Sequence, residues 1–229
     1  MSAPRTARER ARAELTQAIK DSARRQLAEV GPRALSLRAV ARELGMVSSA
    51  VYRYFGSLDD LFTALIIDAY NAVGGQAELA DAEAREKGAT PAERWLAVSR
   101  AVREWALAHR HEFELLYGTP IPGYAAPQDT TTAAARMPLT LVGICNDAIA
   151  AGTNFPADRP TVAPELFTDD IAALVDDPSR AYAGRVVLAW SGLIGVISFE
   201  LFGQFVGIIT DYAAYFDYTA SATAAELGL

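Results

Sequence analysis

The stretch SLRAVARELGMVSSAVYRYFGSLDDL, residues 36–61, decides the fold of this chain. Its first part is predicted to be a short helix, because Ser36 can cap it and apolar residues follow at helical spacing. Those apolar residues are Leu37, Val40, Ala41 and Leu44. Gly45 then gives the backbone the freedom to leave that helix sharply. A second short helix is predicted over Ser48–Phe55, so the stretch indicates a helix-turn-helix.

The second helix carries an exposed polar and aromatic face. This face consists of Ser48, Ser49, Tyr52, Arg53 and Tyr54. An arginine can bond bidentately to guanine in the major groove or to phosphate, and tyrosine hydroxyls suit phosphate oxygens. Ser36 and Arg38 lie at the start of the first helix, where free N–H groups also attract phosphate. The alternative is an ordinary solvated helix face.

The charge is divided unevenly along the chain. The 229 residues carry a formal net charge of −7, with 51% hydrophobic and 21% charged residues, which indicates a globular protein. Residues 1–60 hold eleven Lys and Arg against seven Asp and Glu, a net +4, whereas the remainder carries −11. A basic head on an acidic body is the asymmetry expected when only one end of the chain meets phosphate.

The N-terminal segment 1–13 is rich in arginine. Arg5, Arg8, Arg10 and Arg12 are expected on a frayed arm that contacts phosphate or the minor groove. The alternative is a solvated tail that aids solubility. A helix with apolar residues at four-residue spacing follows from Leu15 and is predicted to end at Gly31-Pro32.

The rest of the chain predicts only helices, for a total of nine or ten. Ser57, with Asp60 three residues later, is expected to cap a long helix that reaches Gly74-Gly75. Further helices are predicted from Thr90-Pro91, over Thr131–Ala151, over Glu165–Val175 and over Asp211–Leu227. The fold class is therefore all-α.

The helix-turn-helix resembles the DNA-binding domain of the TetR family of bacterial transcriptional repressors. The matching residues are Ala41, Leu44-Gly45, Val51-Tyr52, Tyr54-Phe55, Ser57 and Leu61. The resemblance implies a DNA-binding domain over 1–56 and an effector-binding and dimerisation domain over 57–229. It implies DNA contacts from Arg8, Ser36, Arg38, Ser48, Ser49, Tyr52, Arg53, Tyr54 and Ser57. The chain departs from the family at Val47, so that Ser48 is expected to cap the second helix instead, and at Leu58, where many members have a phosphate-binding lysine.

Two strings of the body resemble the C-terminal domain of one TetR subgroup that carries a Trp-His-Gly signature. They are WALAHRHEFELLYGTPIPGYAAP (Trp105–Pro127) and AWSGLIGVISFELFGQF (Ala189–Phe205), with Trp190 and Gly195 present and Ile194 in place of the histidine. Such regulators bind a small effector in the body, and the lack of a buried cationic run suggests an apolar or weakly polar one. The candidate ligand-binding residues are Trp105, Phe113, Tyr117, Tyr124, Met137, Leu141 and Trp190; each taken alone is more often plain core, and the collective case rests on the resemblance.

Residues 186–210 contain a single charge, Glu200, and could be mistaken for a membrane span. We expect instead a mostly buried helix at a dimer interface, where the GxxxG from Gly203 to Gly207 would allow close packing. In the TetR family the last two helices pair with their copies. The candidate interface residues are Gly195, Phe199, Gly203, Gly207 and Tyr215, and no membrane contact is expected.

No catalytic or metal site is predicted. His109 and His111 point to different sides of a helix, so packing or capping near a helix end is expected for them. The pairs Asp169-Asp170 and Asp176-Asp177 are expected to cap helices, and Cys145 to be a small buried side chain. No nucleophile–base pair or phosphate loop supports an enzyme, and no cofactor is expected. With no secretory signal, a cytoplasmic protein is expected.

These features predict a ligand-responsive repressor that binds a palindromic operator of double-stranded DNA as a homodimer. A small effector would shift the long helix from Leu58 to Val73 and change the spacing of the two recognition helices. The alternatives are an activator, regulation without a ligand, or a helical small-molecule-binding protein.

Overall fold

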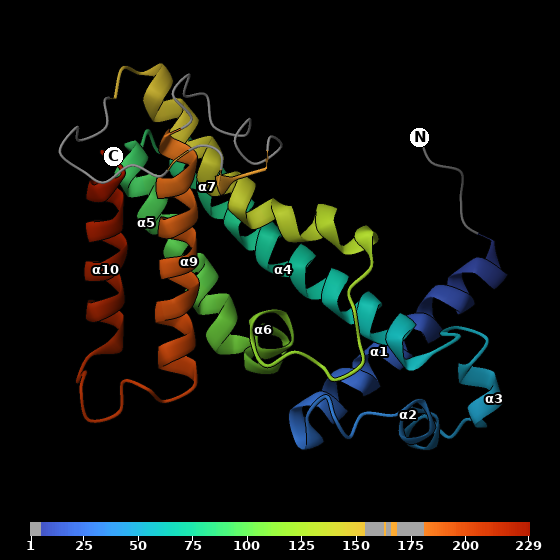
Figure 1. Cartoon of the computed structure of the whole chain (residues 1–229). Helices are drawn as coiled ribbons and strands as arrows, with labels where there is room; N and C mark the ends of the chain where they lie inside the picture. The colour runs from blue at the N-terminus through green and yellow to red at the C-terminus, as the bar shows by residue number, and fades with distance from the viewer. Residues whose placement is uncertain (1–5, 154–162, 164–165, 169–180) are drawn as a thin grey trace. The chain divides into compact units, whose positions relative to one another are not determined.

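The computed structural model describes residues 6–153, 163, 166–168 and 181–229 (Figure 1). Within those ranges there are nine α-helices, one short 3₁₀ helix and no strand, which confirms the all-α fold class. Most of the helix predicted over residues 165–175 and both aspartate pairs of that region lie outside the described residues. Contacts divide the chain into two compact units.

Unit 1 comprises residues 1–69 and 111–131. It holds α1 (Ala7–Val30), α2 (Leu37–Glu43), α3 (Ser48–Val51), the first part of α4 (Leu58–Glu86), most of α6 (Arg110–Tyr117) and the 3₁₀ helix Gln128–Thr130. Apolar side chains from the first four helices and the turn after α3 form one core, which includes Ile19, Ala23, Leu27, Val40, Val51, Phe55, Leu61 and Leu65. The helix-turn-helix therefore shares one core with α1 and with the first part of α4.

The N-terminus of α1 differs from the prediction. Thr6 and Glu9 form a reciprocal capping box, with 2.7 Å from the Thr6 N–H to the Glu9 carboxylate and 3.2 Å from the Glu9 N–H to the Thr6 hydroxyl. The helix consequently begins at Ala7, and the expectation that Arg8 lies on a frayed arm is wrong. At the other end Gly31 adopts a φ of 73° and caps the helix, as predicted.

The recognition helix is shorter than predicted. α3 begins after Val47, which offers no side-chain cap, so the expectation that Ser48 caps this helix is wrong. Regular helix ends at Val51, and the N–H groups of Tyr52, Arg53 and Tyr54 then bond to carbonyls three or four residues earlier. These three residues therefore continue the turn of the helix without extending it regularly.

The long helix α4 runs through the two glycines that were expected to end it. It continues from Leu58 to Glu86, so Gly74 and Gly75 are interior residues. A Cβ atom built at Gly74 would lie 2.6 Å from the Cβ of Arg136 on α7 (Thr131–Ala150). The sequence pattern was misread because Gly74 serves the close approach of two helices, not a helix end.

Unit 2 comprises residues 70–110 and 132–229. It contains the remainder of α4, α5 (Pro91–Ala108), α7, α9 (Ala181–Leu201) and α10 (Tyr212–Glu226). α5 contacts both α9 and α10, and Figure 1 shows these last two helices side by side. Thr90 caps α5 through its side chain, as the sequence predicts, and Asp211 caps α10 in the same way.

α9 ends before the two glycines of the predicted GxxxG. Gly203 and Gly207 lie in the connection to α10 with φ values of 76° and 77°. They are turn residues, so the prediction that they pack two helices closely is wrong. The segment Ala183–Leu201 is long and apolar enough to cross a membrane by length and composition alone, and 33% of its most apolar window is buried within the chain.

Candidate DNA-binding interface and effector-binding unit

A carboxylate at the end of α2 fixes this helix on α1. Glu43 accepts hydrogen bonds from Ser22 Oγ at 2.8 Å, Arg25 Nε at 2.8 Å and Gln26 Nε2 at 3.1 Å. Hydrogen bonds from Gln26, Ser22 and Arg25, with the charge of Arg25, lower the pKa of Glu43 to about 2. The carboxylate is therefore ionised at neutral pH and orients the helix that precedes the recognition helix.

The recognition face consists of Ser48, Ser49, Tyr52, Arg53 and Tyr54, all carried by α3 and the turn that continues it. Ser49, Arg53 and Tyr52 are exposed, the last at 47%, whereas Ser48 and Tyr54 are half-buried. The guanidinium carbon of Arg12 lies 5.2 Å from the centroid of the Tyr54 ring. This cation–π contact, which sequence reasoning missed, places an α1 arginine beside the recognition face.

The cations of unit 1 fall into two groups. Lys20, Arg24 and Arg25 form ion pairs with Asp68, Asp21 and Glu43. A second group is exposed and takes part in no ion pair among the described residues: Arg8, Arg10, Arg12, Arg33, Arg38, Arg42 and Arg53. Only the second group has charge available for phosphate, and it includes the three arginines predicted to contact DNA.

Ser36 and Ser57 have structural roles that leave a donor available. Ser36 Oγ accepts the Ala39 N–H at 3.2 Å, and Ser57 Oγ accepts the Asp60 N–H at 3.0 Å. Each hydroxyl has therefore used one acceptor site, while its own hydrogen can still be donated to a phosphate oxygen. Leu58, where a lysine was expected, is half-buried and packs on the core of unit 1.

Three of the predicted ligand-binding residues belong to unit 1. Phe113 is fully buried, with its ring 5.0 Å from that of Tyr117. Tyr124 packs on the unit 1 core, with its ring 5.8 Å from Phe62 and its hydroxyl 3.0 Å from Thr63 Oγ1. Tyr124 thus joins the segment after α6 to the first part of α4.

The other four belong to unit 2. Met137 and Leu141 on α7 are fully buried, and Trp105 on α5 is nearly so. Trp105 stacks on His109, whose Nδ1 lies 2.9 Å from the Trp105 carbonyl oxygen, so His109 closes the helix end as expected. Trp190 on α9 is half-buried, and its indole nitrogen is buried without a hydrogen-bond partner.

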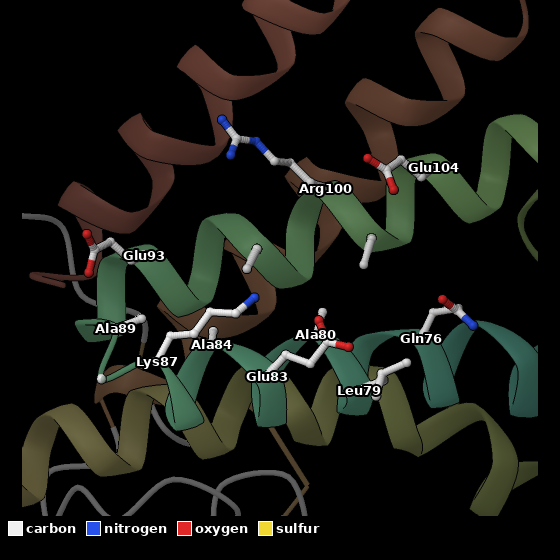
Figure 2. A pocket seen from close by; sticks show the side chains of 13 residues that line it. Gln76, Leu79, Ala80, Glu83, Ala84, Lys87, Ala89, Glu93, Arg100 and Glu104 are labelled. Carbon is white, nitrogen blue, oxygen red and sulfur yellow. The ribbon is translucent and has the colours of Figure 1, made fainter.

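A groove that the sequence did not indicate lies between α4 and α5 (Figure 2). It has a volume of about 790 Å³, and none of the predicted ligand-binding residues lines it. Small side chains such as Ala80, Ala84 and Ala97 leave the space between the helices, and charged residues such as Glu83 and Lys87 border it. Its openness to solvent suits a surface groove more than an enclosed effector site.

The last two helices of unit 2 expose apolar side chains. They are Leu188 and Phe199 on α9, Phe202, Val206 and Ile208 in the connection, and Tyr218 on α10, with Leu188 72% exposed. Of the predicted interface residues, Gly195 and Tyr215 are half-buried on α9 and α10. Within the connection Phe205 packs edge-on against Tyr215 at 5.4 Å. Exposed apolar side chains gathered in this way are typical of interaction surfaces.

Comparisons with known proteins agree with this architecture. The family described as bacterial regulatory proteins, tetR family, matches residues 19–65, and the tetracyclin repressor-like C-terminal domain matches residues 95–223. HTH-type transcriptional regulators Rv1816 of Mycobacterium tuberculosis and Mb1846 of Mycobacterium bovis are each 42% identical over 218 residues, covering 90% of this chain and 89% of their own. None of these matches identifies the Trp-His-Gly subgroup.

Solved structures show the same fold. The crystal structure of SCO4313 is 37% identical, covers 96% of this chain and 100% of its own, and has a TM-score of 0.77. RolR, solved in complex with resorcinol, is 16% identical, covers 95% and 93%, and has a TM-score of 0.54. The helix-turn-helix, the helical unit 2 and these matches lead to one conclusion: the chain belongs to the TetR family of transcriptional regulators, with an N-terminal DNA-binding domain and a C-terminal ligand-binding domain.

Proposed function

We propose that this protein is a cytoplasmic repressor that binds a palindromic DNA operator as a homodimer and is released by a small apolar effector. The observation that carries the proposal is the set of exposed, unpaired arginines around the recognition face. Arg53 on that face and Arg38 on α2 are exposed and outside every ion pair of the described residues. Their charge is free to contact bases and phosphates.

Dimerisation through α9 and α10 is supported by their exposed apolar side chains. Leu188 and Phe199 lie on the same helix, which is only one-third buried in its most apolar window. Glu200 of this helix is paired with Arg103 on α5, with 2.6 Å between Arg103 Nη2 and Glu200 Oε1. A second copy of the helix pair would cover the apolar face and set the separation of two recognition helices at about 34–36 Å.

Coupling between effector and DNA would pass through α4. This helix contributes its first part to unit 1 and its second part to unit 2. An effector that favours one arrangement of α4 would shift the population away from the DNA-binding state. RolR, which shares the fold, was solved with resorcinol, a small aromatic molecule, and we propose an effector of similar size for this chain.

In vitro selection from random duplexes tests the DNA-binding part of the proposal. We expect a palindromic consensus bound by two chains. Replacing Arg53 by alanine should weaken binding to the consensus by roughly 1–3 kcal/mol if the arginine reads a base, while binding to random DNA changes less. Arg110→Ala is the matched control, because Arg110 is also exposed and lies outside the helix-turn-helix.

Two results would contradict the proposal. If selection yields no consensus sequence, the proposal that the protein binds DNA sequence-specifically is wrong. If the wild type and Arg53→Ala bind the consensus with equal affinity, Arg53 does not contact the DNA. A third result would identify the second candidate function, an activator. In that case the consensus lies upstream of genes whose expression is lost when the protein is deleted.

A further inference from the structure

α7 contains a proline that divides it into two segments. Pro138 lies within this helix, which begins at Thr131 and ends at Ala150. Proline has no N–H to donate to the carbonyl four residues earlier, and its ring pushes that carbonyl away, so helices bend at such a residue. Figure 1 shows α7 bending part-way along its length. Residues 131–137 therefore form a leading segment of α7, and residues 139–150 form a trailing segment.

The trailing segment is fixed within unit 2. Four of its side chains are fully buried: Leu141, Ile144, Cys145 and Ala148. The carboxylate of Asp147 accepts hydrogen bonds from Arg85 on α4 and from Arg94 on α5, the latter at 2.8 Å. These contacts join the trailing segment to two other helices, so it moves with the body of unit 2.

The leading segment is bonded to α4 through Arg136. Nη1 of Arg136 donates to the Asn71 carbonyl oxygen at 3.1 Å and to Asn71 Oδ1 at 2.8 Å. Nε and Nη2 donate to the two carboxylate oxygens of Glu78, at 2.8 Å and 2.6 Å. The hydrogen bonds from Arg136 hold the pKa of Glu78 below its ordinary value, so the pair stays charged at neutral pH. One side chain therefore makes four hydrogen bonds to two residues of α4.

Gly74 brings the backbones of the two helices together at this point. Asn71, Gly74 and Glu78 follow at spacings of three and four residues, so they lie on one face of α4. A Cβ atom at Gly74 would lie 2.6 Å from the Cβ of Arg136, an approach that only glycine allows. Because the bidentate pair with Glu78 also has a fixed geometry, the leading segment can move only if α4 moves with it or the four hydrogen bonds break.

The part of α4 that Arg136 holds leads directly to the helix-turn-helix along the chain. Unit 1 includes α4 as far as Ala69, so Asn71 is the second residue of this helix in unit 2. Between Asn71 and Leu58 the helix contains no proline, and Phe62 and Leu65 belong to the core that the helix-turn-helix shares. A helix is a rigid element that can carry energetic coupling. A displacement at Asn71 is therefore passed to the helix-turn-helix by one uninterrupted helix.

We infer that the leading segment of α7 is a hinged relay, joined to α4 by Arg136 and separated from the trailing segment by Pro138, that passes changes in unit 2 to the helix-turn-helix. This inference rests on the proposed function, in which α4 couples effector and DNA, and it adds the element that moves α4. Arg136 is a positioning residue, because it acts on DNA binding only through α4.

The test uses the full-length protein and the operator duplex obtained by selection. Coupling between two sites is reciprocal, so DNA bound to the helix-turn-helix must in turn restrain the leading segment. Hydrogen–deuterium exchange is measured by mass spectrometry with and without the duplex. We expect the duplex to slow exchange in residues 131–137 by at least about 5-fold, and to affect residues 139–150 less.

Arg136→Met should abolish the slowing in residues 131–137 while the duplex still protects residues 36–55. Arg136→Lys, which keeps the charge but not the bidentate geometry, should retain part of the slowing. Arg100→Met is the matched control, because Arg100 on α5 makes the same kind of bidentate pair, with Asp217 on α10 at 2.8 Å and 2.7 Å. It should respond as the wild type does. Pro138→Ala, which restores the missing helix N–H, should extend the slowing into residues 139–150.

The relay is overturned if the duplex protects residues 36–55 but leaves exchange in residues 131–137 unchanged, or if Arg136→Met responds as the wild type does. An equal loss of the response in Arg100→Met would show that Arg136 has no special role. A response of Pro138→Ala that stays within residues 131–137 would contradict the hinge. Failure of the proposed function gives a different result, in which no duplex protects residues 36–55, and the relay is then wrong as well.

Discussion

Two adjacent glycines within α4 give a prediction that tests the packing of unit 2. A Cβ at Gly74 would lie 2.6 Å from the Cβ of Arg136, whereas a Cβ at Gly75 has its nearest neighbour, the Nη2 atom of Arg136, at 3.8 Å. Carbon atoms in contact prefer about 3.5–4.0 Å, so alanine at 74 must push α7 away by about 1 Å. Alanine at 75 fits without movement.

The free energies follow from this difference. Alanine in place of a helical glycine stabilises the helix by roughly 0.5–1 kcal/mol at either position. At position 74, overpacking adds a penalty of about 1–3 kcal/mol. It also strains the bonds from Arg136 to Asn71 and Glu78, which join α7 to α4 one turn before and after Gly74 at 2.6–3.1 Å.

We therefore expect Gly75→Ala to be more stable than wild type by about 0.5–1 kcal/mol and Gly74→Ala to be less stable by about 1–2 kcal/mol. For a chain of this size the two variants should differ in melting temperature by about 4–10 °C, measured by calorimetry at neutral pH. Equal stability of the two variants would refute the close approach of α7 to Gly74.

Three further predictions concern charged residues. Glu43→Gln should lower the free energy of unfolding by about 1 kcal/mol at pH 7. This value is kept small because the Glu43 side chain is 35% exposed and water screens its charge. Because the folded pKa of about 2 lies below the ordinary 4.5, this contribution is present above pH 4.5 and lost as pH falls towards 2. Urea unfolding at several pH values should show the difference shrinking in that window, with Glu14→Gln as an indifferent control; a constant difference would contradict the pKa. Arg94→Leu should lower the free energy of unfolding by about 3 kcal/mol in the same assay. The Arg94 side chain is only 6% exposed, and its removal leaves the carboxylates of Asp81 and Asp147 without their partner. Arg100→Leu, on an ion pair that is about half exposed, should lose less than about 1 kcal/mol, and an equal loss in both would show that burial does not decide these energies.

The helix-turn-helix was predictable because local signals decide it. Ser36 and Ser57 cap α2 and α4 through their side chains, and Gly31 ends α1 through its positive φ. Each of these signals belongs to a single residue. Each signal acts within a few residues, so neighbouring residues alone reveal it. The same reasoning placed Thr90 before α5 correctly.

The predictions from sequence were wrong for residues whose structural role depends on contacts or backbone geometry outside their local pattern. Gly74 looks like a helix end in sequence, but its function depends on Arg136, sixty-two positions away. Gly203 looks like a helix-packing residue, yet its left-handed backbone belongs to the turn after α9.

Contacts between side chains on different helices were missed for the same reason. Arg12 beside Tyr54 was missed because the capping box at Thr6 extends α1 towards the N-terminus. Side-chain partners across helices are a property of packing, which periodicity does not encode.

The most direct test of the central claim is a competition between the selected operator and a scrambled duplex of equal length, measured at about 0.15 M salt. Sequence-specific binding through the recognition face predicts a preference of at least about 10³-fold for the operator. The same experiment with Arg53→Ala should reduce that preference by roughly 5- to 100-fold while binding to the scrambled duplex changes little. Equal affinity of the wild-type protein for both duplexes would contradict the claim.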